Sequence, residues 1–162
     1  MFARIIILCF IFIATTGFGS TDSKNNVVAE ITAKFSRAVA EKNAVHFKSL
    51  FLNEKVSWFA VISEQDLNRN KANPSQKKVN LHEIGPFSEW LVNTQESTEV
   101  KFSDCKASGD ADVMVADCEY AFSLGGKKNN YGREVFILIN TESGWKISGI
   151  AFSATGPKKD GK

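Results

Sequence analysis

Histidine and cysteine are scarce in this chain, with two and three of them in 162 residues. The two histidines, His46 and His82, are widely separated from each other and from the cysteines, so no cluster has the spacing of metal ligands. The signatures of serine hydrolases, phosphate-binding loops and zinc-binding helices are also absent. We therefore expect no metal centre and no cofactor.

A strong excess of charge is missing too. Lys and Arg number 20 against 18 Asp and Glu, a net charge of +2. Such a balance gives no reason to expect nucleic acid or an anionic membrane as a partner. With 43% apolar residues, the chain has enough apolar side chains for the core of one globular domain.

Long hydrophobic runs are limited to residues 5–14, whereas a membrane-spanning helix needs about 20 residues. This run follows Arg4 and precedes small residues at 17–20, which is the layout of a secretory signal peptide. We predict that residues 1–20 are removed on export to a periplasmic or secreted location, with no membrane contact afterwards. The alternative is a buried N-terminal helix.

One domain is predicted over residues 24–155, with a disordered basic tail at 156–162. Its first part shows helical periodicity, with a cap at Asn25 or Asn26 and an end near Lys42. Asn43 is placed to cap a second, shorter helix that contains His46. The apolar positions of the first helix are Val27, Ile31, Phe35, Ala38 and Val39.

The middle of the chain changes character twice. Residues 56–62 form a short run of strand-favouring residues that is apolar on both faces, which predicts a buried strand. Residues 63–78 are polar and predict a long loop, either a solvated segment or a binding loop. Asn80 and Glu83 then have the spacing of a capping box for a third helix.

The C-terminal half predicts antiparallel strands. Residues 98–107 and 113–124 are joined near 108–110, and a turn at 125–130 leads into a hairpin over 131–154. Alternation in 113–124 places Cys118 and Tyr120 on an apolar face. Asp117 and Glu119 belong to the opposite, polar face, and should point away from any pocket.

Two cysteines, Cys105 and Cys118, remain once the N-terminal segment is set aside. An exported protein can pair them in a disulfide between neighbouring strands, provided that a wide loop or a β-bulge corrects their register. The alternative is two buried thiols.

Several segments together resemble the nuclear transport factor 2-like superfamily, which includes SnoaL-like proteins and ketosteroid isomerases. They are the helix that runs into the bend at 43–44, the helix with Phe87 and Trp90, the strand YGREVFILIN and the segment GWKISGIAFS at 144–153. The resemblance implies an α+β fold in which a cone-shaped, curved, antiparallel or mixed sheet wraps three N-terminal helices. It also implies an apolar pocket and a dimer interface on the outer sheet face.

Enzymes of this superfamily carry an Asp or His inside the cone, but no catalytic motif of theirs is matched here. Glu134 shares a face with Phe136 and Leu138, so it is either a pocket carboxylate with a raised pKa or a rim residue paired with a lysine. Glu134 and His46 are the candidate acid–base residues, while His82 is expected at the surface. Aromatic residues from separate elements form the candidate ligand site or simply the core: Trp58, Phe87, Trp90, Tyr120, Phe136 and Phe152.

The sequence thus favours an exported domain that binds a small apolar molecule or a peptide in its cone without catalysis. One alternative is an enzyme of the isomerase or dehydratase type. A second alternative is a protein-interaction module that forms a homodimer.

Overall fold

The computed structural model describes residues 21–69 and 77–157. The predicted signal segment and the last five residues of the predicted tail lie outside the described residues. No helix in the described parts is long and apolar enough to cross a membrane.

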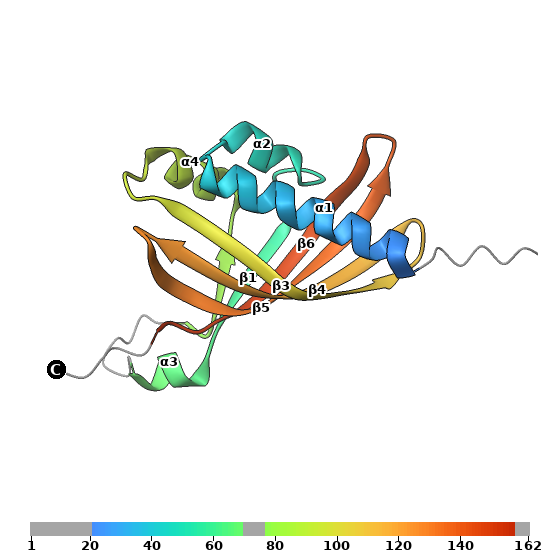
Figure 1. The fold of residues 1–162 in the computed structure, drawn as a ribbon. Helices are drawn as coiled ribbons and strands as arrows, with labels where there is room; N and C mark the ends of the chain where they lie inside the picture. The colour runs from blue at the N-terminus through green and yellow to red at the C-terminus, as the bar shows by residue number, and fades with distance from the viewer. Residues whose placement is uncertain (1–20, 70–76, 158–162) are drawn as a thin grey trace, which may run out of the picture.

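A single curved sheet forms the body of the domain, with the strand order β2-β1-β6-β5-β4-β3 (Figure 1). The strands are β1 Ser57–Ile62, β2 Val79–His82, β3 Thr98–Gly109, β4 Val113–Leu124, β5 Lys127–Thr141 and β6 Gly144–Ala154. All neighbours are antiparallel except β1 and β6, which are parallel. The predicted α+β fold with a curved mixed sheet is confirmed.

Helices cover the concave face of this sheet. The elements are α1 Thr21–Ala40, α2 Ala44–Ser49, α3 Glu64–Arg69 and α4 Ile84–Asn93. Figure 1 shows α1, α2 and α4 together over one side of the sheet, whereas α3 lies apart from them near the C-terminal end.

The turn between α1 and α2 follows the sequence prediction in part. Lys42 adopts a left-handed conformation with φ 54°, which lets the Asn43 N–H donate to the Ala38 carbonyl and close α1. Asn43 then caps α2, because its Oδ1 accepts a 3.0 Å hydrogen bond from the His46 N–H. The predicted cap at Asn25 or Asn26 is wrong, since α1 already begins at Thr21.

Two short elements were missed in the polar middle of the chain. The predicted loop at 63–78 contains α3, whose first turn is capped by the Ser63 side chain through the Asp66 N–H. Asn80, predicted as a helix cap, lies in β2 instead, and Glu83 caps α4 without a side-chain hydrogen bond. The strand predicted to be buried on both faces is buried on one only, because Phe59 is 39% exposed.

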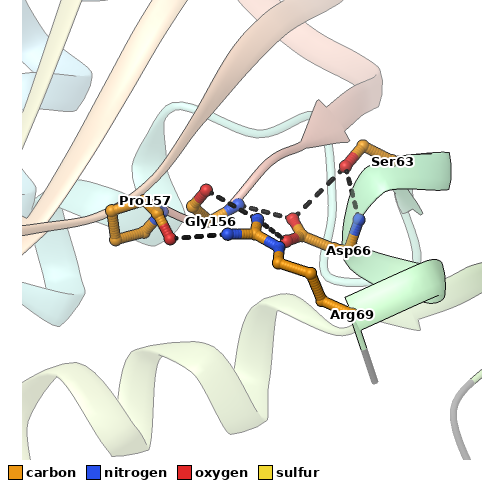
Figure 2. Close-up of polar contacts among 5 residues, drawn as sticks. All are labelled: Ser63, Asp66, Arg69, Gly156 and Pro157. Atoms are coloured by element: carbon orange, nitrogen blue, oxygen red, sulfur yellow. Dashed lines mark hydrogen bonds and ion pairs between the residues drawn. The ribbon is translucent and has the colours of Figure 1, made fainter. Parts of the chain in front are cut away.

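Helix α3 is tied to the end of the chain (Figure 2). Asp66 accepts a 2.5 Å hydrogen bond from the Gly156 N–H and pairs with Arg69, which donates in turn to the carbonyls of Gly156 and Pro157. Gly156 and Pro157 belong to the segment predicted as a disordered tail, yet the structure gives both defined contacts.

Aromatic rings from both layers form the centre of the core. Phe35 of α1 contacts Phe47 of α2 and Phe136 of β5, with ring centroids 5.1 and 6.0 Å apart. Phe47 and Phe136 are fully buried. These contacts fix the helices over the middle of the sheet and leave one end of the cone less filled.

A disulfide joins Cys105 of β3 to Cys118 of β4, as predicted. The register between these strands shifts between Ser103 and Lys106, and Asp104 has φ 47°. This is the β-bulge that the spacing of the two cysteines required.

Candidate functional site

A cavity of about 530 Å³ occupies the end of the cone between α4, the start of β5 and the inner sheet face. Residues from α1, α4 and all six strands contribute to its walls. Aromatic rings make up a large share of the walls, at Phe35, Trp58, Phe87, Trp90, Tyr120, Phe122 and Phe152.

Strand register brings the inner-face residues together in rows across the sheet. Glu134 on β5 lies between Cys118 on β4 and Phe152 on β6. In the adjacent part of the sheet, Trp58 lies opposite Ile150 on one side and His82 on the other. The disulfide, the buried carboxyl and a cavity ring therefore follow one another along one row.

The rings of the cavity wall contact one another. Trp58 lies 4.9 Å from Phe87, and Phe87 lies 5.4 Å from Trp90, measured between ring centroids. Tyr120 packs edge-on against Phe152 at 5.6 Å. Because each ring is held by neighbours on other elements, the wall is supported around the cavity instead of collapsing into it.

Glu134 is the buried acidic residue of the site, with 4% of its surface exposed. Burial raises the pKa of its carboxyl to about 8. Within the described part of the chain, no hydrogen bond or ion pair reaches this side chain. The carboxyl is thus mainly protonated at pH 7, in contact with the cavity and without a protein partner.

Tyr120 lies beside Glu134 but is engaged elsewhere. Its hydroxyl is 2.9 Å from Asn130 Oδ1 and 3.1 Å from the Ser153 carbonyl oxygen, either of which can accept its proton. Gly132 faces the same carbonyl, and a Cβ there would lie 2.1 Å from the Ser153 oxygen. Burial, with a further contribution from the charge of Glu134, raises the pKa of Tyr120, so this phenol remains protonated.

His82, expected at the surface, is half-buried and also lines the cavity. Its ring packs 5.5 Å from Trp58 and 5.6 Å from Phe152. Burial lowers the pKa of His82, which favours the neutral imidazole at pH 7. His82 is placed in the cavity wall by β2, and this strand of four residues is too short to be predicted from the sequence.

Charge in the cavity wall has one sign. Glu83 and Glu134 contribute carboxyl groups, and among the described residues no lysine or arginine lines the cavity. The indole N–H of Trp58 is buried and has no hydrogen-bond partner in the described parts. The described residues also contain no group of three or more potential metal ligands.

The predicted site residues divide into two groups. Five of the six aromatic candidates line the cavity, whereas Phe136 is fully buried against Phe35 and Phe102 and belongs to the core. Glu134 lines the cavity, but His46 does not. His46 is exposed on α2 and borders a second hollow, of about 450 Å³, near the turn between β5 and β6. Phe122 was not predicted, although it lies on the same apolar face as Tyr120.

The molecule is therefore a cone-shaped α+β domain with a ring-lined cavity and a buried acid. No family model and no curated protein matches the chain, but solved structures match most of it. An NTF2-like superfamily protein from Salmonella enterica superposes with a TM-score of 0.58 at 14% identity, covering 88% of this chain and 96% of that one. An NTF2-like protein of unknown function from Pseudomonas putida gives 0.60 at 11% identity, with coverages of 90% and 95%.

A proposed dehydratase of the NTF2-like family from Streptomyces avermitilis is similar as well. Its TM-score is 0.58 at 16% identity, and the match covers 85% of this chain and all of that one. The chain has the nuclear transport factor 2-like fold, which confirms the resemblance seen in the sequence. Identities this low establish the fold and leave the activity open.

Proposed function

We propose that the cone binds a small, largely apolar molecule and does not transform it. The observation that carries this proposal is the cavity itself, which stays open although the neighbouring core is filled by rings. Its volume of about 530 Å³ is within the 300 to 1,000 Å³ that is usual for small-molecule sites. The predicted ligand-binding residues Trp58, Phe87, Trp90, Tyr120 and Phe152 supply its walls.

A neutral fluorescent probe can test this proposal. We expect N-phenyl-1-naphthylamine to bind with enhanced emission, and energy transfer from the cavity tryptophans to report its position. Val100→Phe places a larger side chain on a buried wall residue, so it should fill part of the cavity. The ligand then buries less of its own apolar surface, and we expect its affinity to fall at least about tenfold. Val45→Phe, on the exposed side of α2, is the matched control. Equal binding by both variants, or no binding by the native chain, would contradict the proposal.

A second candidate function is proton transfer by Glu134. A protonated carboxyl in an apolar cavity, close to a tyrosine, is the arrangement that isomerase and dehydratase chemistry uses for acid–base steps. It would accept or donate one proton at a substrate carbon or oxygen. The structural similarity to a proposed dehydratase is in line with this candidate.

Isotope exchange separates the two candidates. The ketone 2-tetralone is small and apolar, and it has acidic C–H bonds beside its carbonyl. If Glu134 transfers protons, the native chain accelerates deuterium uptake from D2O and Glu134→Gln abolishes the acceleration. If 2-tetralone binds but takes up deuterium no faster than in buffer alone, proton transfer is ruled out and binding without catalysis remains as the function.

We also propose that the protein acts outside the cytoplasm. The disulfide supports this location, because such bonds persist in oxidising compartments. Mass spectrometry of the exported protein should find an N-terminus near residue 20 and a mass two hydrogens below that of the dithiol. An intact N-terminus in the soluble cytoplasmic fraction would overturn the proposal.

A further inference from the structure

The charges around the cavity are one-sided. The chain contains 20 lysine and arginine residues, yet among the described residues none lines the cavity, whereas two carboxyl groups do. His82 adds no positive charge near neutral pH, since burial lowers its pKa. An anionic ligand would therefore enter an apolar site with no group to balance its charge.

Glu134 differs from two paired carboxylates of the fold. Asp66 pairs with Arg69 and accepts the Gly156 N–H, and Asp117 pairs with Arg133. Glu134 is more buried than either, but in the described parts of the chain no cation pairs with it and no hydrogen bond reaches its side chain. Buried acids normally have a cation or a hydrogen-bond donor as a partner. A positive group on a bound ligand would take that place at Glu134.

The surrounding rings could stabilise a positive group in the same place. Trp58, Phe87 and Phe152 come from three elements and line the cavity that Glu134 also lines. Indole and phenyl faces attract cations, most strongly where water is excluded. Aromatic walls that carry carboxyl groups and no lysine or arginine among the described residues have the features that recognise organic cations.

We propose that the ligand of the cone is an organic cation, a small ammonium compound whose charge lies against Glu134 and whose apolar substituents contact the rings. This inference rests on the proposed binding function and specifies its ligand class. A neutral ligand with a carbonyl group is the competing class, because it would accept a hydrogen bond from the protonated carboxyl.

A pair of probes with the same shape distinguishes the classes. Phenyltrimethylammonium carries a fixed positive charge, and tert-butylbenzene is its neutral isostere. Titration calorimetry of the purified chain at pH 8.5 should show the cation binding at least about tenfold more tightly, as expected for a desolvated charge near an acid and rings. Glu134→Gln should reduce the preference to within about threefold, while Glu142→Gln, an exposed turn residue, should leave it unchanged.

The pH dependence gives an independent readout. A fixed cation favours the ionised carboxylate, so its affinity should rise with pH up to about 8 and then level off. The other titratable groups that line the cavity are Tyr120 on β4, His82 on β2 and Glu83 at the start of α4; the wall residues of α1, β1, β3 and β6 do not titrate. A carbonyl ligand would show the opposite slope, because it needs the proton.

The outcomes separate this inference from the function on which it rests. If tert-butylbenzene binds and the cation binds no better, or if affinity for the cation falls as pH rises, the ligand class is wrong and apolar binding stands. If neither probe nor N-phenyl-1-naphthylamine binds, both proposals fail. Preference for the cation that survives Glu134→Gln would overturn the role of Glu134.

Discussion

Glu134 combines burial with the lack of a partner, and its side chain affects stability as well as binding. Alternation along β5 predicts that it shares the inner face with Phe136 and Leu138. Its depth could not be predicted, because that depends on the curvature of the sheet and on the rings of α4. The lysine partner considered from the sequence is absent among the described residues, so nothing offsets the burial that raises the pKa of Glu134.

Stability should fall with rising pH because of this residue. Its pKa is about 8 in the fold against an ordinary value of 4.5, so the stabilising contribution of the protonated form is complete below pH 4.5 and lost as pH approaches 8. Glu134→Gln should remove this dependence and stabilise the chain above pH 8 by roughly 3 to 5 kcal/mol. Urea unfolding at pH 5, 7 and 9 measures the effect.

Glu142→Gln is the control for this prediction. It makes the same chemical change at an exposed turn position, where solvent surrounds the side chain in both the folded and unfolded states. Its unfolding curve should follow that of the native chain at each pH. Parallel curves for Glu134→Gln and the native chain would show that Glu134 is solvated.

At the scale of elements, long periodic segments were predicted well and short polar ones were not. The alternation over 113–124 gave β4 with its bounds and faces, because twelve residues sample the pattern several times. Helix α3 has six residues and none is buried. Its cap at Ser63 is local, but its contacts with Gly156 and Pro157 join residues far apart in the sequence, which no local pattern reveals.

The contact between α3 and the chain end is testable through Asp66. Asp66→Ala removes the acceptor of the Gly156 N–H and the partner of Arg69. We expect faster hydrogen exchange of the Gly156 amide and a loss of about 1 to 3 kcal/mol in unfolding free energy. Glu54→Ala, which breaks the exposed pair with Lys48, should lower it by less than about 1 kcal/mol. Unchanged exchange at Gly156 would refute the contact.

The disulfide should stabilise the pairing of β3 and β4. The bond closes a loop with a sequence separation of 13, for which loss of chain entropy in the unfolded state predicts about 3 kcal/mol. The double variant Cys105→Ala/Cys118→Ala should unfold at lower urea concentration by that amount. Dithiothreitol should lower the urea concentration at which the native chain unfolds by a similar amount and should not change that of the variant. An unfolding curve of the native chain that does not respond to the reductant would contradict the prediction.

For the whole molecule, the outer face of the sheet carries an exposed apolar surface. Val115 and Ile137 lie side by side on β4 and β5, and both are more than a third exposed. Phe59 on β1 extends this surface beyond β6. The predicted homodimer would bury these side chains, and we propose this face as its interface.

Sedimentation at micromolar concentrations tests this association. Ile137→Lys places a charge in the apolar surface and should convert a dimer to a monomer, with a loss of at least about tenfold in association constant. Val45→Lys changes an exposed valine on α2, on the opposite side of the sheet, and should leave the assembly intact. A native chain that sediments as a monomer at all these concentrations would refute the proposed homodimer.

The parallel pairing of β1 with β6 has a consequence for how the chain acquires its structure. Residues 57–62 have only the short β2 as a neighbour until residues 149–154 join them. Pairing over so large a sequence separation slows folding. A chain emerging from the ribosome thus lacks the long partner of its first strand until residues 149–154 have been made.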